Sequence, residues 1–82
     1  MPTKEDFLNE IKAQLTEAKT KGVEYVDIIS GDVHRKLGGY PGTNHRMQTC
    51  CMAMYELMKA NDEILHAPES TYGATVEIRY YL

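Results

Sequence analysis

The sequence lacks any long apolar run and any set of spaced cysteines. No stretch approaches the ~20 consecutive apolar residues that a helix needs to cross a bilayer. The polar first residues lack the apolar core of a signal peptide. The two cysteines, Cys50 and Cys51, are adjacent, whereas secreted mini-proteins are held by several spaced disulfides. We therefore expect a reduced, cytoplasmic protein with no membrane partner.

The chain has the length and composition of one small globular domain. It has 82 residues, of which 43% are hydrophobic and 26% are charged, and these proportions are ordinary for a soluble protein. A domain of this size buries only about 60% of the surface that its unfolded chain exposes. We therefore expect a single domain over residues 1–82, with one core and little room for a deep catalytic cleft.

Local signals predict a helix and then a short strand in the first third of the chain. Thr3 and Asp6 have the spacing of a capping box, and Gly22 is a typical residue just after a helix end. Between them, apolar residues recur at helical spacing, which predicts a helix over residues 4–20. Residues 23–29 are rich in β-branched side chains and are expected to be extended.

Two further helices are expected in the middle of the chain. Ser30 is expected to cap the second helix, which the pair Gly38–Gly39 ends. Thr43 or Asn44 is expected to cap the third helix, which runs to Asn61. An apolar stripe on the third helix, at spacings of three and four, is expected to be core. Its members are Met47, Cys50, Cys51, Met54, Leu57 and Met58.

The last third of the chain predicts two strands. Residues 63–67 form a short β-prone run, residues 68–73 favour a turn, and residues 74–82 alternate between apolar and polar side chains. Such alternation is typical of a half-buried antiparallel strand, and a hairpin is the simplest connection. We therefore expect an α+β fold, the winged helix-turn-helix, with a three-helix bundle and a C-terminal β-hairpin wing.

A helix-turn-helix protein places the first part of its second helix in the major groove of DNA. In this chain that helix is the third, and its outward residues include Gln48, Thr49 and Met52. Gln can contact adenine in a bidentate manner, Thr can donate or accept, and an apolar tip can contact a thymine methyl group. His45 and Arg46, at the start of the helix, complete the residues expected in the groove.

The charge distribution favours the same side of the domain. The formal net charge is −3, yet residues 33–55 contain neither Asp nor Glu and include Arg35, Lys36 and Arg46. A local positive surface can therefore exist on an acidic protein, and we expect Arg35 and Lys36 to contact phosphates. Three or four such contacts give a salt slope of only about −3 to −4. The expected wing has an acid, Glu69, and no base, which argues against DNA binding.

The same features have a structural interpretation. The outward side of the third helix is also ordinary for a solvated face, Asp32 is expected to pair with Arg35, and His34 is expected to be a polar surface residue. The alternative function is a non-catalytic protein-interaction domain, homodimerising through the third helix or the hairpin edge. An exposed Met52 beside Tyr55 would suit such a contact.

Neither an enzyme nor a metal site is expected. Structural zinc sites pair their ligands at spacings of two to four residues, whereas Cys50 and Cys51 diverge by about 100° on a helix. Both fall on the apolar stripe, where a thiol is a small hydrophobe and a poor nucleophile. No glycine-rich phosphate loop is present. We therefore expect no catalytic residue, no metal, no cofactor and no small-molecule substrate.

Several short motifs resemble a family of small bacterial winged-helix domains of unassigned function, found alone or attached to restriction-type and nuclease proteins. The resemblance covers about two thirds of the chain. It implies the winged-helix fold and a DNA-related context, but no catalytic residue and no ligand. The motifs are Gly31-Asp32-x-His34-Arg35-x-x-Gly38, Asn44-His45-Arg46, Cys51-x-x-Met54 and Gly73-Ala74-Thr75-x-x-Ile78-Arg79-Tyr80.

Overall fold

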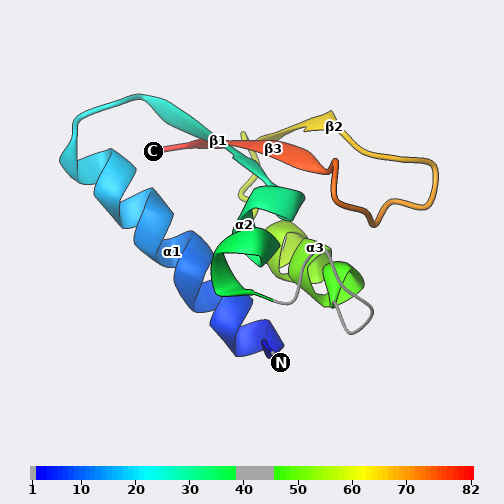
Figure 1. Ribbon diagram of the computed structural model, residues 1–82. Coiled ribbons are helices and arrows are strands. Elements are labelled where there is room, and N and C mark those ends of the chain that lie inside the picture. The colour runs from blue at the N-terminus through cyan, green and yellow to red at the C-terminus, as the bar shows by residue number, and fades with distance from the viewer. Residues whose placement is uncertain (1, 39–45) are drawn as a thin grey trace.

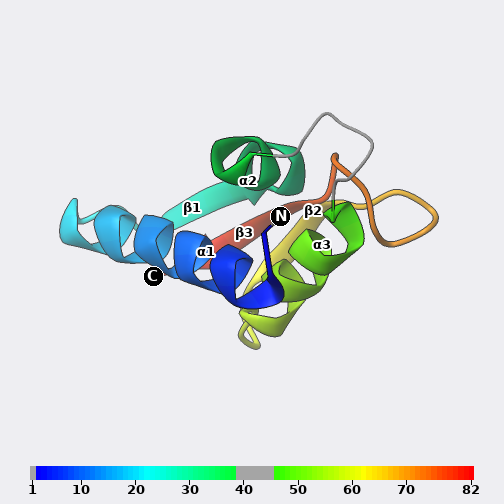
Figure 2. The same ribbon diagram turned by 60° about the horizontal axis from the view of Figure 1, so that its bottom comes forward.

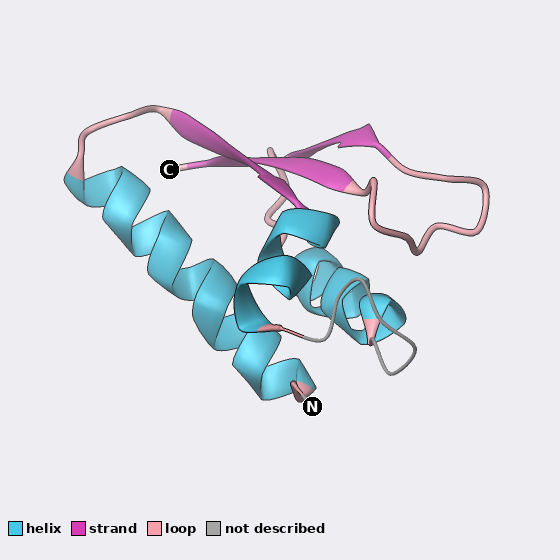
Figure 3. Ribbon diagram, in the orientation of Figure 1, coloured by secondary structure: helices cyan, strands magenta, loops and turns pink. Residues whose placement is uncertain are grey.

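A computed structural model describes residues 2–38 and 46–82. The described residues form an α+β fold of three helices and a three-stranded antiparallel sheet, with the helices on one side of the sheet (Figure 1, Figure 3). None of the described helices has the length and apolar character required to cross a membrane. In chain order the elements are α1 (Lys4–Thr20), β1 (Tyr25–Ile29), α2 (Ser30–Leu37), α3 (Met47–Glu56), β2 (Glu63–His66) and β3 (Glu77–Tyr81).

Helix α1 has the predicted bounds and caps. The Thr3 N–H donates to Asp6 Oδ2 at 2.8 Å, and the Asp6 N–H donates to Thr3 Oγ1 at 3.2 Å. Gly22 follows the C-cap residue with a φ of +80°, a left-handed conformation that favours glycine. The capping box and the glycine stop are therefore confirmed, and α1 presents Phe7 and Ile11 to the core.

The sheet differs from the predicted two-stranded hairpin, because β1 joins it as a third strand. Its order is β1-β3-β2, and β1 pairs with β3 from Tyr25 opposite Tyr81 to Ile29 opposite Glu77. Strand β3 begins at Glu77 and not at residue 74 as predicted, since residues 73–76 contact α2 and α3 instead of continuing the ladder with β2. The last two strands are therefore the centre, β3, and one edge, β2, of a three-stranded sheet, and not the separate two-stranded hairpin that was predicted.

Helix α3 has the predicted buried stripe but is shorter than predicted. It begins at Met47 with Arg46 as N-cap and ends at Glu56, whereas the predicted end was Asn61. The predicted caps Thr43 and Asn44 lie outside the described residues. Four stripe positions are buried and the last two are half-buried against the core, which confirms the stripe: Met47, Cys50, Cys51 and Met54, then Leu57 and Met58.

One core lies between the helices and the inner face of the sheet. Ile78 and Tyr80 of β3 are fully buried, and so is Val76 just before this strand. The Tyr80 hydroxyl donates to the Met54 carbonyl at 2.7 Å, so the polar end of this ring has a partner within the core. Burial raises the pKa of Tyr80 well above its ordinary value. Figure 2 shows α1 and α3 side by side, with α2 next to β1.

Candidate nucleic-acid interface

The outward side of α3 is exposed where the sequence predicted a DNA-reading surface. Gln48 and Met52 are exposed and Thr49 is half-buried. Arg46 is exposed at the start of the helix, where the helix dipole favours an anion. The predicted residue His45 lies outside the described residues. The structure therefore exposes Arg46 at the start of α3 and Gln48 and Met52 along it.

The start of α3 is held by a histidine of α2. His34 is fully buried, and its Nε2 accepts the Arg46 N–H at 2.7 Å. Its Nδ1–H donates to the Gly38 carbonyl at 3.0 Å, and its ring meets Phe7 edge-on with centroids 4.9 Å apart. The prediction of a polar surface role for His34 is wrong, because α1 and α3 cover it.

The start of α2 contacts the segment before β3. The Ser30 hydroxyl donates to the Gly73 carbonyl, and the Gly31 N–H donates to the Ala74 carbonyl at 3.0 Å. The predicted cap role of Ser30 is wrong, because Ile29 is the N-cap and Ser30 is already helical. A Cβ on Gly31 would lie 2.8 Å from the Ala74 oxygen, so only glycine fits this close approach.

The two cysteines are core residues, as predicted, and their thiols bond to α2 and to the segment before β3. Both are fully buried. The Cys51 thiol donates to the Gly73 carbonyl at 3.2 Å and accepts the Gly73 N–H at 3.3 Å, while the Cys50 thiol donates to the Ser30 carbonyl at 3.5 Å. Burial, followed by the adjacent Cys51, raises the pKa of the Cys50 thiol to about 12. Such a thiol is a poor nucleophile at neutral pH.

The loop between β2 and β3 lies against α3. The Tyr55 hydroxyl donates to the Thr71 carbonyl at 2.6 Å, and the rings of Tyr55 and Tyr72 meet edge-on with centroids 6.1 Å apart. Thr71 has a φ of +73°, which is uncommon for a residue other than glycine. Met52 and Tyr72 expose 42% and 37% of their surface. The predicted turn over residues 68–73 thus lies against α3 through Tyr55, a contact that the sequence did not predict.

The predicted phosphate contacts on α2 already have carboxylate partners. Arg35 is exposed and pairs with Asp32 at 2.9 Å, as predicted. Lys36 is also exposed, and its Nζ lies 3.1 Å from Glu10 Oε2. The Gln14 side chain and then Lys36 hold the pKa of Glu10 below its ordinary value. A phosphate would have to compete with these two carboxylates.

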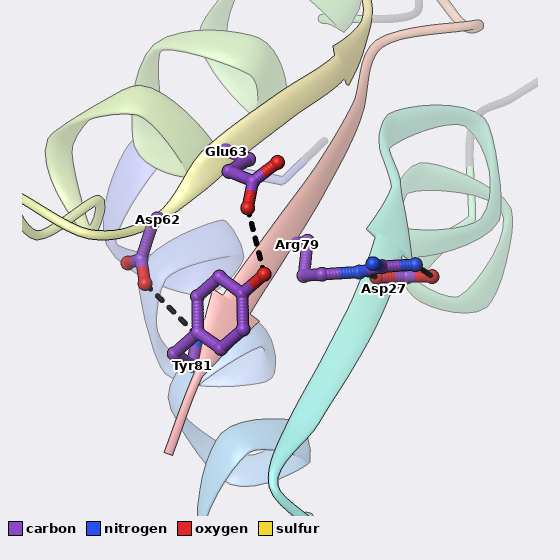
Figure 4. Close-up of polar contacts among 5 residues, drawn as sticks. All are labelled: Asp27, Asp62, Glu63, Arg79 and Tyr81. Carbon is purple, nitrogen blue, oxygen red and sulfur yellow. Dashed lines mark hydrogen bonds and ion pairs between the residues drawn. The ribbon is translucent and has the colours of Figure 1, made fainter.

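A second polar cluster crosses the outer face of the sheet (Figure 4). Arg79 makes two hydrogen bonds to Asp27, at 2.8 and 3.1 Å, and its guanidinium lies 4.1 Å from the Tyr25 ring centre. The Tyr81 hydroxyl donates to Glu63 at 2.7 Å. Asp27 and Arg79 share one register position of β1 and β3. The alternation of residues 74–82 placed Arg79 and Tyr81 on one face of the strand but could not identify their partners.

The described residues show no metal-binding cluster. No three or more His, Cys, Asp or Glu side chains in residues 2–38 and 46–82 are placed to hold an ion together. Of the candidate ligands, Cys50, Cys51 and His34 make the hydrogen bonds described above, and His66 is exposed on β2. Comparison with family models, with curated proteins and with solved structures finds no match for this chain.

Proposed function

We propose that the chain is a winged helix-turn-helix domain that binds double-stranded DNA through the exposed side of α3. The observation that supports it best is the two-sided character of α3. One side is buried in the core, and the other presents Gln48, Thr49 and Met52. These residues lie in the segment 33–55, which contains no acidic residue. Side chains of these types can contact base edges in a major groove.

The antiparallel pairing of the last two strands supports the winged-helix part of this proposal, whereas the order α-β-α-α-β-β departs from the usual winged helix-turn-helix with a C-terminal hairpin. A strand, two helices and two strands follow α1, and the last two strands are antiparallel neighbours. In this proposal α2 and α3 form the helix-turn-helix, and the β2–β3 loop is the wing. His34 fixes the start of α3 against α2, which suits a helix that must enter a groove at a defined angle.

The charges set the strength expected of this interaction. If Arg35, Lys36 and Arg46 each neutralise one phosphate, the logarithm of the binding constant falls with the logarithm of salt concentration at a slope of about −3. The Arg35–Asp32 and Lys36–Glu10 pairs must break for these contacts to form, which reduces the favourable free energy of DNA binding further. Glu69 in the wing adds no attraction for DNA. A single copy should therefore bind random DNA weakly at physiological salt.

The test is a titration of labelled random duplex DNA at low and moderate salt. The double variant Arg35→Ala/Lys36→Ala should bind more weakly and reduce the slope by about 2. The matched control is Lys12→Ala/Lys19→Ala, which removes the same charge from exposed positions of α1 and should leave the slope unchanged. Absence of binding by the wild type at low salt, where electrostatic attraction is strongest, would overturn the proposal.

A second candidate function is protein binding at the same side of α3. It is favoured by the exposed Met52 and by the exposed Tyr72, whose ring contacts Tyr55, because methionine and aromatic residues are enriched at protein interfaces. The DNA titration separates the two functions. Under protein binding, the wild type shows no DNA affinity even at low salt.

A further inference from the structure

The exposed residues of α3 form a single row along the helix. Gln48, Met52 and Glu56 are exposed, and each is four residues from the next, whereas the other residues of α3 are buried or half-buried. Residues four apart lie only about 40° from each other around a helix, because each residue turns the chain by about 100°. From the start of α3 to its end, this exposed row therefore presents an amide, an apolar tip and a carboxylate.

Charge distinguishes the two ends of the exposed row. The start of α3 has the exposed Arg46 as its N-cap residue and lies in the segment 33–55, which contains no acidic residue. Glu56 is the last residue of α3, and its carboxylate pairs with Lys4 of α1. The phosphates that border a DNA groove repel a carboxylate and attract a cation. The first two turns of α3 are therefore the part suited to face the bases.

The two exposed residues of these turns, Gln48 and Met52, both suit an A·T base pair. A Gln amide forms two hydrogen bonds with adenine, at N6 and N7. A Met side chain has no N–H or O–H donor, and the apolar group that base pairs present in the major groove is the methyl group of thymine. Against a G·C pair, Met52 would cover polar groups without replacing their hydrogen bonds to water, which costs free energy.

We propose that α3 selects A·T pairs, with Gln48 contacting an adenine and Met52 contacting the methyl group of a thymine. This inference rests on the proposed DNA binding and adds a sequence preference to it. Four residues advance by about 6 Å along a helix axis, and successive base pairs are about 3.4 Å apart. With α3 lying along the groove, the two contacted base pairs are therefore about two steps apart in the DNA.

Contacts on the inner side of α3 hold the exposed row in a defined position. The His34 ring accepts the Arg46 N–H and ties the start of α3 to α2. The Cys51 thiol and the Tyr55 hydroxyl donate to carbonyl groups of the turn 68–73. Base contacts need side chains on an element that is fixed by such packing and hydrogen bonds, so α3 is a suitable support for two specific contacts.

Selection of bound duplexes from a random pool at low salt, followed by sequencing, tests the preference. The intact wild-type chain should enrich A·T pairs at two positions about two steps apart. Gln48→Ala should lose the preference at one position, and Met52→Ala should lose it at the other. The matched control is Asn9→Ala, which removes an amide from an exposed position of α1 and should keep both preferences. All three substitutions are at exposed positions, so the urea midpoints should stay close to that of the wild type.

Base analogues in the selected duplex test each contact at a single atom or group. Uracil in place of the thymine removes only the methyl group, and it should weaken wild-type binding about fivefold or more while leaving Met52→Ala unaffected. Adenine without its N7 acceptor, as 7-deazaadenine, should weaken the wild type in the same way and leave Gln48→Ala unaffected. A merely structural role of Gln48 or Met52 would not make the protein sensitive to these changes in the DNA.

The outcomes separate this inference from the proposed function. If the wild type binds duplex DNA but enriches no A·T pair, or if uracil and 7-deazaadenine have no effect, the base preference is wrong and DNA binding stands. If the wild type binds no duplex even at low salt, the proposed function fails and the base preference fails with it. Equal sensitivity of the wild type and Met52→Ala to uracil would overturn the contact assigned to Met52.

Discussion

His34 Nε2 accepts the backbone N–H of Arg46 at 2.7 Å. Arg46 is the N-cap of α3 and its own side chain makes no capping bond. A side chain of α2 thus performs the part that a Glu or Gln at the third helical position performs in a capping box. The bond links the end of α2 to the start of α3, so the orientation of the exposed side of α3 depends on one buried imidazole.

Replacement of His34 by Ala should strongly destabilise the fold. It leaves the Arg46 N–H and the Gly38 carbonyl without this partner and opens a cavity beside Phe7. We expect the free energy of unfolding to fall by about 2–4 kcal/mol, measured by urea denaturation. Arg35→Ala, at the next and exposed position, should change it by less than about 1 kcal/mol. Equal midpoints for the two variants would contradict this role.

Gly31→Ala should destabilise the protein although alanine is the better helix former. Helix propensity alone predicts a gain of about 1 kcal/mol for this change in a helix. The new Cβ would lie 2.8 Å from the Ala74 carbonyl oxygen, which also accepts the Gly31 N–H. We expect a lower thermal midpoint by differential scanning calorimetry. A higher midpoint would show that Ala74 moves away without cost.

The predictable parts of the fold are those with local signals. Helix α1 carries its own caps and a long apolar period, so its bounds followed from the sequence. The pairing of β1 with β3 joins residues 25–29 to residues 77–81, and a five-residue strand carries no mark of its partner. For the same reason the Asp27–Arg79 pair could not be predicted.

The sequence predicted which residues of the candidate site are exposed, but not which contacts hold the site in place. The helical period of α3 identified Gln48 and Met52 as outward. It could not show that Cys51 and Tyr55 anchor the loop beside them, because these contacts depend on tertiary approach. His34 lies in a segment rich in polar residues, and its burial follows only from how α1 and α3 cover α2.

Both thiols should be unreactive in the folded protein. Cys50 and Cys51 are fully buried, and burial raises the pKa of Cys50 to about 12. Thiolate is the reactive form, so modification by an aromatic disulfide reagent at pH 8 should require opening of the fold. We expect two thiols to react within seconds in denaturant and at a far lower rate without it. Rapid native labelling of either cysteine would contradict the packing of α3.

The ion pair between Asp27 and Arg79 should make the stability depend on acid pH. Arg79 hydrogen bonds hold the pKa of Asp27 below its ordinary value, so the folded state binds this proton less readily than the unfolded state. The contribution is complete above the ordinary Asp pKa, about 4, and is lost as the pH falls through the lowered value. Asp27→Asn should therefore lower the thermal midpoint at pH 7 and have a smaller effect below that window.

Solvent limits how much the Asp27–Arg79 ion pair stabilises the fold. Both side chains are 29% exposed, and exposed ion pairs contribute little to stability. The comparison that isolates Asp27 is the difference between the wild-type and Asp27→Asn midpoints from pH 7 to pH 2, since the other carboxyl groups titrate in both proteins. Asp32→Asn is the matched control, because the described contact of Asp32 is with Arg35 of its own helix and not with β3. A wild-type minus Asp27→Asn difference that stays constant with pH would show that the Asp27–Arg79 bonds do not form in solution.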